Sequence, residues 1–163
     1  MNPRVDEIVL LTHEWESMRI WWGTLLDAEP RPVGHRTVVV ETADLRVVIE
    51  QSDIAMNANP EVAGVISLTV SAPSAIAALD THERLVAIGS RHHRATNDPG
   101  GVRLWYRDPN GTDVAIRLPI DADANNRPGQ EIDPDHIITR LRAAAESTKP
   151  ECVSAKEVRA KGE

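Results

Sequence analysis

The sequence predicts an α+β protein in which one order of strands and helix occurs twice. A short aliphatic segment, a segment with helical spacing of apolar residues and then two or three alternating strands are followed by the same order again. The second copy begins 58 residues after the first if Glu7 is aligned with Val65, which places EIVLLT over VISLTV. The chain has no Phe, one Tyr and four Trp, so its core must be mainly aliphatic.

The first copy opens with an aliphatic strand and continues into an amphipathic helix. The helix is predicted to end at Asp27, because Pro30 and Pro32 cannot continue it. The apolar stripe of this helix consists of Ile20, Trp21, Thr24 and Leu25. A short turn joins the two strands that follow the helix, as in a β-hairpin. The predicted strands are 7–12, 37–41 and 45–50.

The second copy follows a polar linker at 51–60. Ser71, Pro73 and Ser74 are residues typical of a helix start, and Gly89 is typical of a helix end. The predicted strands are 62–70, 90–95, 101–106 and 113–118.

The remaining 45 residues differ in composition from the two copies. Residues 119–132 are expected to form a loop, and a helix is expected to start at Asp133 and Pro134 and to end near 147. One apolar stripe on that helix comprises Ile137, Ile138, Leu141 and Ala145. Residues 148–163 show no apolar periodicity, and we expect them to be a disordered tail. The two copies together, about 5–51 and 62–118, form one domain over 1–118.

Charge and cysteine content exclude several classes of protein. The formal net charge is −7 and the pI is near 5.4, which argues against nucleic acid as the main partner. The single cysteine, Cys152, cannot form an internal disulfide. No leader sequence and no apolar window long enough for a membrane span is visible, so we expect a cytoplasmic protein without a membrane partner.

Four features together resemble one protein superfamily. The first helix carries an aromatic pair, Trp21-Trp22, followed by Leu25-Leu26-Asp27. The second copy repeats the strand–helix start and closes with the turn Asp108-Pro109-Asn110-Gly111 before its last strand. This pattern resembles the glyoxalase, bleomycin-resistance and extradiol-dioxygenase superfamily, which has the vicinal oxygen chelate fold. Asp27 stands where that superfamily usually has Gly, and Asp tolerates the left-handed conformation better than most residues.

The resemblance implies a fold and a location for the site. Two βαβββ modules would form a curved mixed sheet around a cleft. Metal-dependent members place ligands on the first and last strand of each module. Those positions correspond here to Glu7, Glu50, Val65 and Ala115. Because valine and alanine have no lone pair to donate, we expect no bound metal and no other cofactor.

Strand alternation predicts which side chains face the cleft. Side chains on a strand point alternately to its two faces, and one face of each predicted strand is aliphatic while the other is mixed. The mixed face is either a solvated surface or a cleft with convergent polar groups. The candidate ligand-binding residues are Trp105, Arg103, Trp22, Glu7, Ser67, Thr69 and Arg117.

Some of these side chains have two interpretations. If Trp105 faces the cleft, it could stack on a flat ligand and Arg103 could pair with a carboxylate or phosphate. If it faces the helices, it belongs to the core. Adjacent helical residues differ in direction by about 100°, so of Trp21 and Trp22 we expect one in the core and the other at a module or dimer interface.

Two candidate catalytic residues, Glu50 and His92, come from the same reasoning. Glu50 is either a polar anchor and general base or the partner of Arg46 or Arg117 in a salt bridge. At most one of His92 and His93 can enter the cleft from a strand, and the alternative is a solvated edge.

The preferred hypothesis is a metal-independent protein that binds a small organic molecule, as drug-sequestering members of the bleomycin-resistance type do, and that forms a homodimer. The acidic balance favours a cationic or neutral ligand. The alternative is a glyoxalase-like lyase, isomerase or epimerase with Glu50 as base and His92 or His93 as helper. A third hypothesis is a structural or regulatory module with a vestigial cleft, whose C-terminal helix contacts a partner.

Overall fold

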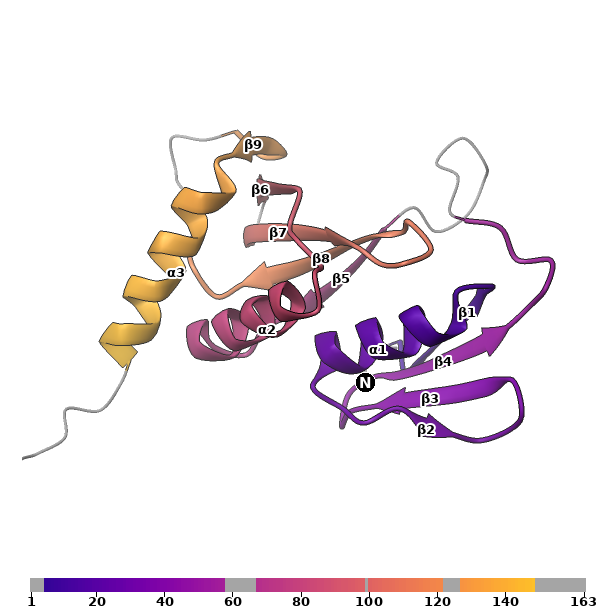
Figure 1. Ribbon diagram of the computed structural model, residues 1–163. Helices are drawn as coiled ribbons and strands as arrows, with labels where there is room; N and C mark the ends of the chain where they lie inside the picture. The colour runs from indigo at the N-terminus through magenta and orange to yellow at the C-terminus, as the bar shows by residue number, and fades with distance from the viewer. Residues whose placement is uncertain (1–4, 58–66, 99, 122–126, 149–163) are drawn as a thin grey trace, which may run out of the picture.

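A computed structural model describes residues 5–57, 67–98, 100–121 and 127–148, and it confirms the α+β fold with two βαβββ modules (Figure 1). Among these residues, no helix is both long and apolar enough to cross a membrane. The first module consists of β1 (Glu7–Thr12), α1 (Trp15–Leu26), β2 (Arg31–Pro32), β3 (Thr37–Glu41) and β4 (Arg46–Gln51). The second module consists of β5 (Ser67–Ser71), α2 (Ala75–Ala87), β6 (Arg94–Asp98), β7 (Gly101–Arg107) and β8 (Asp113–Leu118). β9 (Gln130–Ile132) and α3 (Pro134–Thr148) follow the second module.

Each module forms its own mixed sheet with the same topology. The strand orders are β1-β4-β3-β2 and β5-β8-β7-β6-β9, and in each sheet the first strand pairs in parallel with the last strand of its module. The first strands start at Glu7 and Ser67, and the helices start at Trp15 and Ala75, so both pairs lie sixty residues apart. The repeat is therefore two residues longer than the sequence comparison predicted. Val65, which that comparison used, lies outside the described residues.

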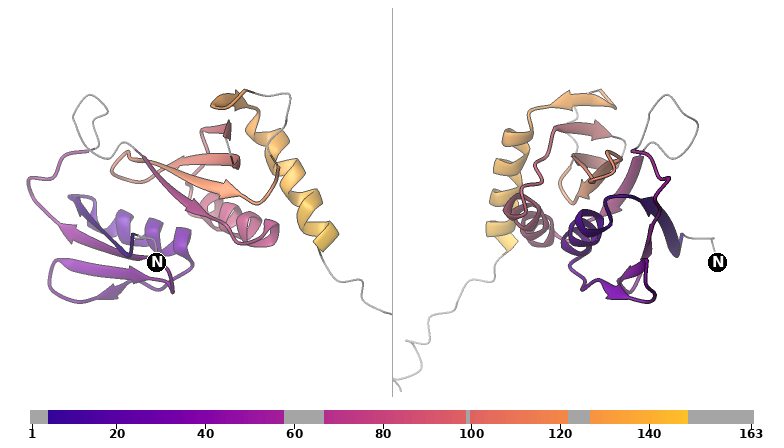
Figure 2. Two further views of the ribbon diagram at one scale, coloured as in Figure 1. Left: turned by 180° about the vertical axis from the view of Figure 1, so that it is seen from behind. Right: turned by 45° about the vertical axis from the view of Figure 1, so that its right-hand side comes forward.

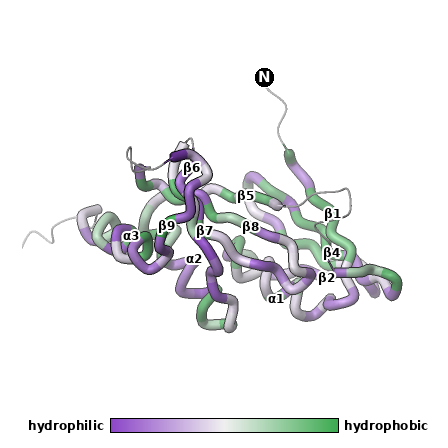
Figure 3. The backbone as a smooth tube through the Cα atoms, turned by 90° about the horizontal axis from the view of Figure 1, so that it is seen from above, coloured by the Kyte–Doolittle hydropathy of each residue, from purple (hydrophilic) through white to green (hydrophobic). Residues whose placement is uncertain are grey.

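The three helices lie in a row on one side of the sheets, with α2 between α1 and α3 (Figure 2). Strand alternation sends aliphatic side chains from both sheets toward this row, as predicted. Val38, Val47 and Ile49 come from the first sheet, and Leu104 and Ile116 come from the second. Figure 3 shows the hydrophobic residues along β1 and β4. The core is thus aliphatic on the sheets and keeps its large rings mainly for the helices.

Both tryptophans of the aromatic pair lie in the core, so the expectation that only one would be there was wrong, although Trp21 does reach the second module as expected. Trp21 is 3% exposed and Trp22 is 0% exposed. Both can be buried because α1 packs on two partners, the first sheet and α2. The Trp21 indole donates a hydrogen bond to Ser90 Oγ at 2.9 Å, on the segment after α2. Ile20 was predicted to belong to the apolar stripe of α1, but it is exposed.

Helix ends agree with the residues that predicted them. Asp27 caps α1 with φ 51°, in the left-handed region expected of a residue that replaces Gly. Ser74 caps α2, and its hydroxyl accepts a hydrogen bond from the Ala77 amide at 3.1 Å. The α3 stripe of Ile137, Ile138, Leu141 and Ala145 is buried as predicted. The tail from 149 onward lies outside the described residues.

Three strand assignments differ from the sequence-based ones. β6 covers Arg94–Asp98 instead of 90–95, so His92 and His93 precede the strand. β2 was not predicted, because a two-residue strand containing Pro32 gives no alternation. β9 lies in the segment expected to be loop and extends the second sheet by pairing with β6.

The turn at residues 108–111 joins the two modules. Gly111 has φ 85°, and its amide donates to the Asp108 carbonyl at 2.8 Å, which closes the turn. This turn presents the buried Asn110 to the end of β1. Thr12 Oγ1 donates to Asn110 Oδ1 at 2.6 Å, and Asn110 Nδ2 donates to the Leu11 carbonyl at 3.0 Å. The Thr12 hydroxyl also accepts from the Glu14 amide at 2.8 Å, so the start of α1 depends on the same contact.

A polar cluster connects α2 with the second sheet and with α3. His82 Nδ1 and the Tyr106 hydroxyl are 2.8 Å apart, and the ring centroids of His82 and His92 are 5.4 Å apart. His92 reaches Asp135 of α3 at 3.9 Å. Burial, followed by the nearby charges of His92 and Arg142, lowers the pKa of His82. Burial also raises the pKa of the Tyr106 hydroxyl, so the neutral forms of both side chains are favoured.

Replacing the buried amide at the module joint tests its contribution. Asn110→Ala should lower the free energy of unfolding by about 1–3 kcal/mol, because the Thr12 hydroxyl and the Leu11 carbonyl lose their partner. Urea denaturation followed by circular dichroism measures this change. The exposed Asn57 supplies the control, since Asn57→Ala should change stability by less than about 0.5 kcal/mol. Equal effects of the two substitutions would contradict the assignment.

The histidine cluster predicts a dependence of stability on pH. A His whose pKa is lowered by folding resists protonation, so its contribution is complete above about pH 6.5 and is lost as the pH falls toward the lowered pKa. Urea unfolding at pH 8 and pH 5 should show a smaller loss of stability for His82→Gln than for the parent chain. His13→Gln alters an exposed histidine beside Glu14 and should keep the parental slope. Identical slopes for all three proteins would refute this prediction.

Candidate functional site

The helices cover one face of each sheet, and the opposite faces hold most of the predicted site residues. We call these the helix-free faces. On the second sheet, register places Thr69, Ala115 and Trp105 side by side, with Ser71, Arg117 and Arg103 in the next row. The helix-free face of the second sheet comprises Ser67, Thr69, Ser71, Arg94, Thr96, Asp98, Arg103, Trp105, Arg107, Asp113, Ala115, Arg117 and Glu131. Five of the seven predicted ligand-binding residues therefore share one surface.

Trp105 forms the floor of this face. It is 7% exposed and lies outside the main core cluster, as does its neighbour Ala115. The indole N–H donates to Thr96 Oγ1 at 2.9 Å, and the Arg94 guanidinium lies 4.3 Å from the ring centroid. Of the two sequence interpretations, the structure therefore selects the one in which Trp105 faces away from the helices. Stacking of Trp105 on a ligand stays a prediction, because Arg94 already covers part of the ring.

Two carboxylates pair with most of the arginines on this face. Asp113 contacts Arg94 at 3.3 Å, Arg107 at 3.1 Å and His93 at 3.3 Å. Burial lowers the pKa of His93, and Asp113 opposes that effect. Asp98 contacts Arg103 at 3.6 Å.

Arg117 is the exception on this face. Its guanidinium has no hydrogen-bond or ion-pair partner among the described residues. It is half-buried and lies directly across the strand pair from Arg103.

The helix-free face of the first sheet is more apolar. Val39 and Val48 are buried there, whereas Val9 and Leu11 of β1 are 53% and 56% exposed. Glu7, a predicted ligand-binding residue, contacts Arg46 at 3.3 Å. This face also holds Arg31, Thr37, Glu41 and Glu50.

On that face, the Glu50 carboxylate has no partner among the described residues. Within the described residues it has no ion pair with Arg46 or Arg117, which were its expected alternative partners. Its candidacy as a base or polar anchor thus stays a prediction.

His92 does not lie where the sequence hypothesis needs it. Because it precedes β6 and packs on His82 and Tyr106, it lies on the helix-covered side of the second sheet. His93 points to the helix-free side, where it meets Asp113. The expectation that His92 shares a cleft with Glu50 is therefore corrected.

The described residues do not fit the metal site that the family resemblance implies. Of the corresponding positions, Glu7 is paired with Arg46, Ala115 has no ligand atom, and Val65 lies outside the described residues. No group of three or more His, Cys, Asp or Glu side chains in the described part is arranged to hold a metal ion. We therefore derive no chemistry through a metal.

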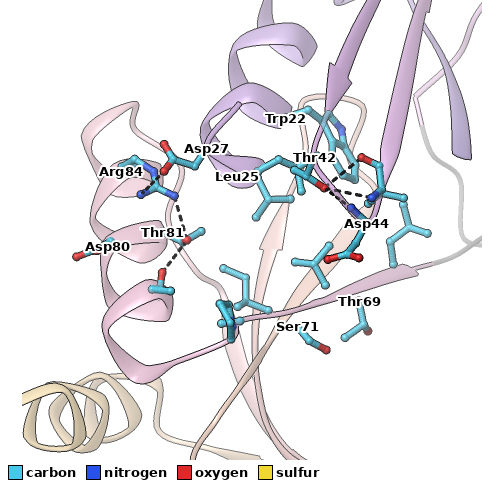
Figure 4. A pocket seen from close by; sticks show the side chains of 18 of the residues that line it. Trp22, Leu25, Asp27, Thr42, Asp44, Thr69, Ser71, Asp80, Thr81 and Arg84 are labelled. Atoms are coloured by element: carbon cyan, nitrogen blue, oxygen red, sulfur yellow. Dashed lines mark hydrogen bonds and ion pairs between the residues drawn. The ribbon is translucent and has the colours of Figure 1, made fainter. Parts of the chain in front are cut away.

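A cavity of about 760 Å³ lies between the modules on the side of the helices (Figure 4). Its walls are mainly aliphatic and include Ile8 and Leu25 of the first module and Leu68 of the second. Polar side chains, among them Asp44 and Asp80, also line it. Arg84 and Asp27, 3.7 Å apart, lie at one end. Two predicted ligand-binding residues, Trp22 and Thr69, also line it.

Sequence reasoning missed several residues of the helix-free face for an identifiable reason. Arg94, Thr96 and Asp98 belong to β6, in which Ala95 is the one apolar residue, so the segment shows no apolar–polar alternation. The strand was therefore expected at 90–95 and these residues were not considered. The cavity gave no sequence signal, since its lining comes from both modules.

Known proteins resemble this chain in sequence and in fold. No family model matches the chain. The chain is 27% identical over 120 residues to biphenyl-2,3-diol 1,2-dioxygenase 2 of Rhodococcus globerulus. The match covers 72% of this chain and 63% of that relative, so the chain spans less than two thirds of the relative's length.

Solved structures match over both modules. One is a glyoxylase/bleomycin resistance protein/dioxygenase domain from a Frankia species, with a TM-score of 0.60, 19% identity and coverage of 72% of this chain and 98% of that one. A second is a putative glyoxalase from Bacillus halodurans, with a TM-score of 0.57, 17% identity and coverage of 71% and 95%. A third is lactoylglutathione lyase from Agrobacterium tumefaciens, with a TM-score of 0.54, 15% identity and coverage of 72% and 95%. Together with its paired βαβββ modules, these matches show that the chain has the vicinal oxygen chelate fold of the glyoxalase, bleomycin-resistance and dioxygenase proteins.

Proposed function

We propose that this chain binds a small organic molecule on the helix-free face of the second sheet and does so without a bound metal. One observation carries the proposal, namely the gathering of Ser67, Thr69, Arg103, Trp105 and Arg117 on one surface. Its floor is apolar, with Trp105 7% exposed beside the fully buried Ala115, and is flanked by several hydrogen-bond donors. An apolar floor with a few convergent polar groups is typical of small-molecule sites.

The intermodule cavity is a second possible location for a ligand. It is large enough for a small molecule and its walls are largely aliphatic. It holds fewer of the residues that the sequence singled out, and its one arginine, Arg84, is already engaged by Asp27, Thr81 and the Thr24 carbonyl. We therefore prefer the helix-free face, and the experiment below distinguishes the two sites.

A catalytic role is the second candidate function. The observation that favours it is Glu50, whose carboxylate has no partner among the described residues. A lyase, isomerase or epimerase needs such a group as base. Since His92 lies on the other side of a sheet, Glu50 would act without it.

We further propose a homodimer. Support comes from the exposed aliphatic residues Val9 and Leu11 on the helix-free face of the first sheet. β1 lies at the edge of that sheet, so a second copy could cover both the edge and the face.

A thermal-shift screen of a small-molecule library, followed by calorimetry on the compounds found, tests the binding function. Thr69→Tyr places a ring over Ala115 and should weaken binding about tenfold or more by steric exclusion. Val9→Tyr makes the same change at the equivalent exposed position sixty residues earlier and should leave binding unchanged. Ala77→Phe intrudes into the intermodule cavity and should also leave it unchanged. Failure of every compound to bind would refute the proposed function. Sensitivity to Ala77→Phe, with or without sensitivity to Thr69→Tyr, would move the ligand to the cavity, because Thr69 also lines it.

Metal analysis tests the proposal that binding needs no metal ion. Plasma mass spectrometry of dialysed protein should find well under one divalent ion per chain, because the described residues at the implied ligand positions do not form a chelating set. Treatment with EDTA should leave the melting temperature and the affinity for the screened compounds unchanged. One tightly held divalent ion per chain would overturn the metal-free proposal.

A further inference from the structure

We infer that the ligand of the helix-free face is an organic anion, whose carboxylate or phosphate group is bound by Arg117 together with Arg103 while its apolar body lies against the exposed edge of Trp105. This inference rests on the proposed function and specifies its ligand class. It replaces the cationic or neutral ligand that the net charge of the whole chain favours.

The local charge of this face is opposite in sign to that of the chain. The chain carries a formal charge of −7. The helix-free face of the second sheet holds four arginines and three carboxylates, a net charge of +1 with histidine neutral. The arginines are Arg94, Arg103, Arg107 and Arg117, and the carboxylates are Asp98, Asp113 and Glu131. Local charge, more than net charge, determines which ligand a face binds.

Arg117 and Arg103 are directly opposite each other on neighbouring antiparallel strands. Like charges in this position repel each other and destabilise the sheet. Asp98 partly offsets the charge of Arg103 from 3.6 Å, but Arg117 has no such partner in the described part of the chain. An oxyanion bound between the two guanidinium groups would turn this repulsion into two charge-assisted attractions.

Donors for such an anion remain available. Arg103 forms no side-chain hydrogen bond among the described residues, since its contact with Asp98 exceeds hydrogen-bond length. Its Nε is buried, so the terminal nitrogens of its partly exposed guanidinium are the donors open to an anion. All five donors of the Arg117 guanidinium lack a partner within the described residues. On the side away from Arg103, the row continues to Ser71 of β5, an exposed residue whose hydroxyl is a further donor.

The repeat of the modules shows that this charge is specific to the second sheet. The register that pairs Ser71 with Arg117 pairs Leu11 with Glu50 in the first module. Arg103 correspondingly takes the place of Thr37. The same backbone position thus has an acidic residue in one module and a basic residue in the other, so the fold alone does not require an arginine there.

Matched phenyl compounds test the ligand class by calorimetry. We expect 4-phenylbutyrate and phenyl phosphate to bind about tenfold more tightly than 4-phenylbutanol, and 4-phenylbutylamine to bind most weakly. Arg117→Met should weaken the two anions about tenfold and leave the alcohol unchanged, whereas Arg117→Lys should retain part of the preference. Asp98→Asn should strengthen binding of the anions severalfold, because it removes the charge that competes for Arg103. Tighter binding is a readout that loss of structure could not produce.

Arg31→Met is the matched control, since it removes an exposed arginine from the helix-free face of the first sheet. Circular dichroism confirms that each variant is folded. Equal affinity for the anion and the amine, or equal effects of Arg117→Met and Arg31→Met, would refute the anion site. If screened compounds bind in a manner sensitive to Thr69→Tyr without any preference for anions, only this inference fails. If neither they nor the phenyl compounds bind, the proposed function fails as well.

Discussion

The two faces of each sheet have different surroundings, and the rest of the molecule depends on that difference. Successive side chains on a strand point to opposite faces, and the three helices cover only one face of each sheet. Every strand therefore supplies aliphatic residues to the core and a second set to the helix-free side. Without Phe, the helix-covered side is filled mainly by Val, Ile and Leu, together with the helix-borne Trp21 and Trp22.

Repetition of the module keeps the backbone while the side chains differ. Trp22 and His82 occupy equivalent places on α1 and α2, sixty residues apart, and both are buried. The first is an apolar ring in the core, and the second belongs to a polar cluster with Tyr106. Glu50 and Arg117 show the same divergence on the helix-free faces. One architecture thus supports two chemically different surfaces in a single chain.

Local patterns predicted the elements well because alternation, caps and prolines act over a few residues. The α3 stripe and the left-handed Asp27 illustrate this. Errors arose where a residue's environment depends on a distant segment. Trp21 is buried only because α2 packs beside α1, which no periodicity within α1 records.

In the candidate site, too, the features set by local patterns were predictable and those set by distant segments were not. Arg103, Trp105 and Arg117 follow from the alternation of their own strands. His92 was misplaced because it was expected within a strand at 90–95, whereas β6 begins at Arg94, so strand alternation does not apply to His92. That Arg117 has no partner in the described part of the chain could not be predicted, since it depends on which carboxylates three neighbouring strands bring close.

The separation of the two sheets has a mechanical consequence. Within each module, ladders of backbone hydrogen bonds resist deformation, but in the described part of the chain no ladder joins β1 to β5. Asn110 with Thr12 and Leu11, Trp21 with Ser90, and Arg84 with Asp27 link the modules, and each link uses at least one side chain. A shear of one module past the other therefore strains side-chain contacts and leaves both sheets intact. We therefore expect the molecule to deform most easily by sliding of the modules along their boundary, where the cavity lies.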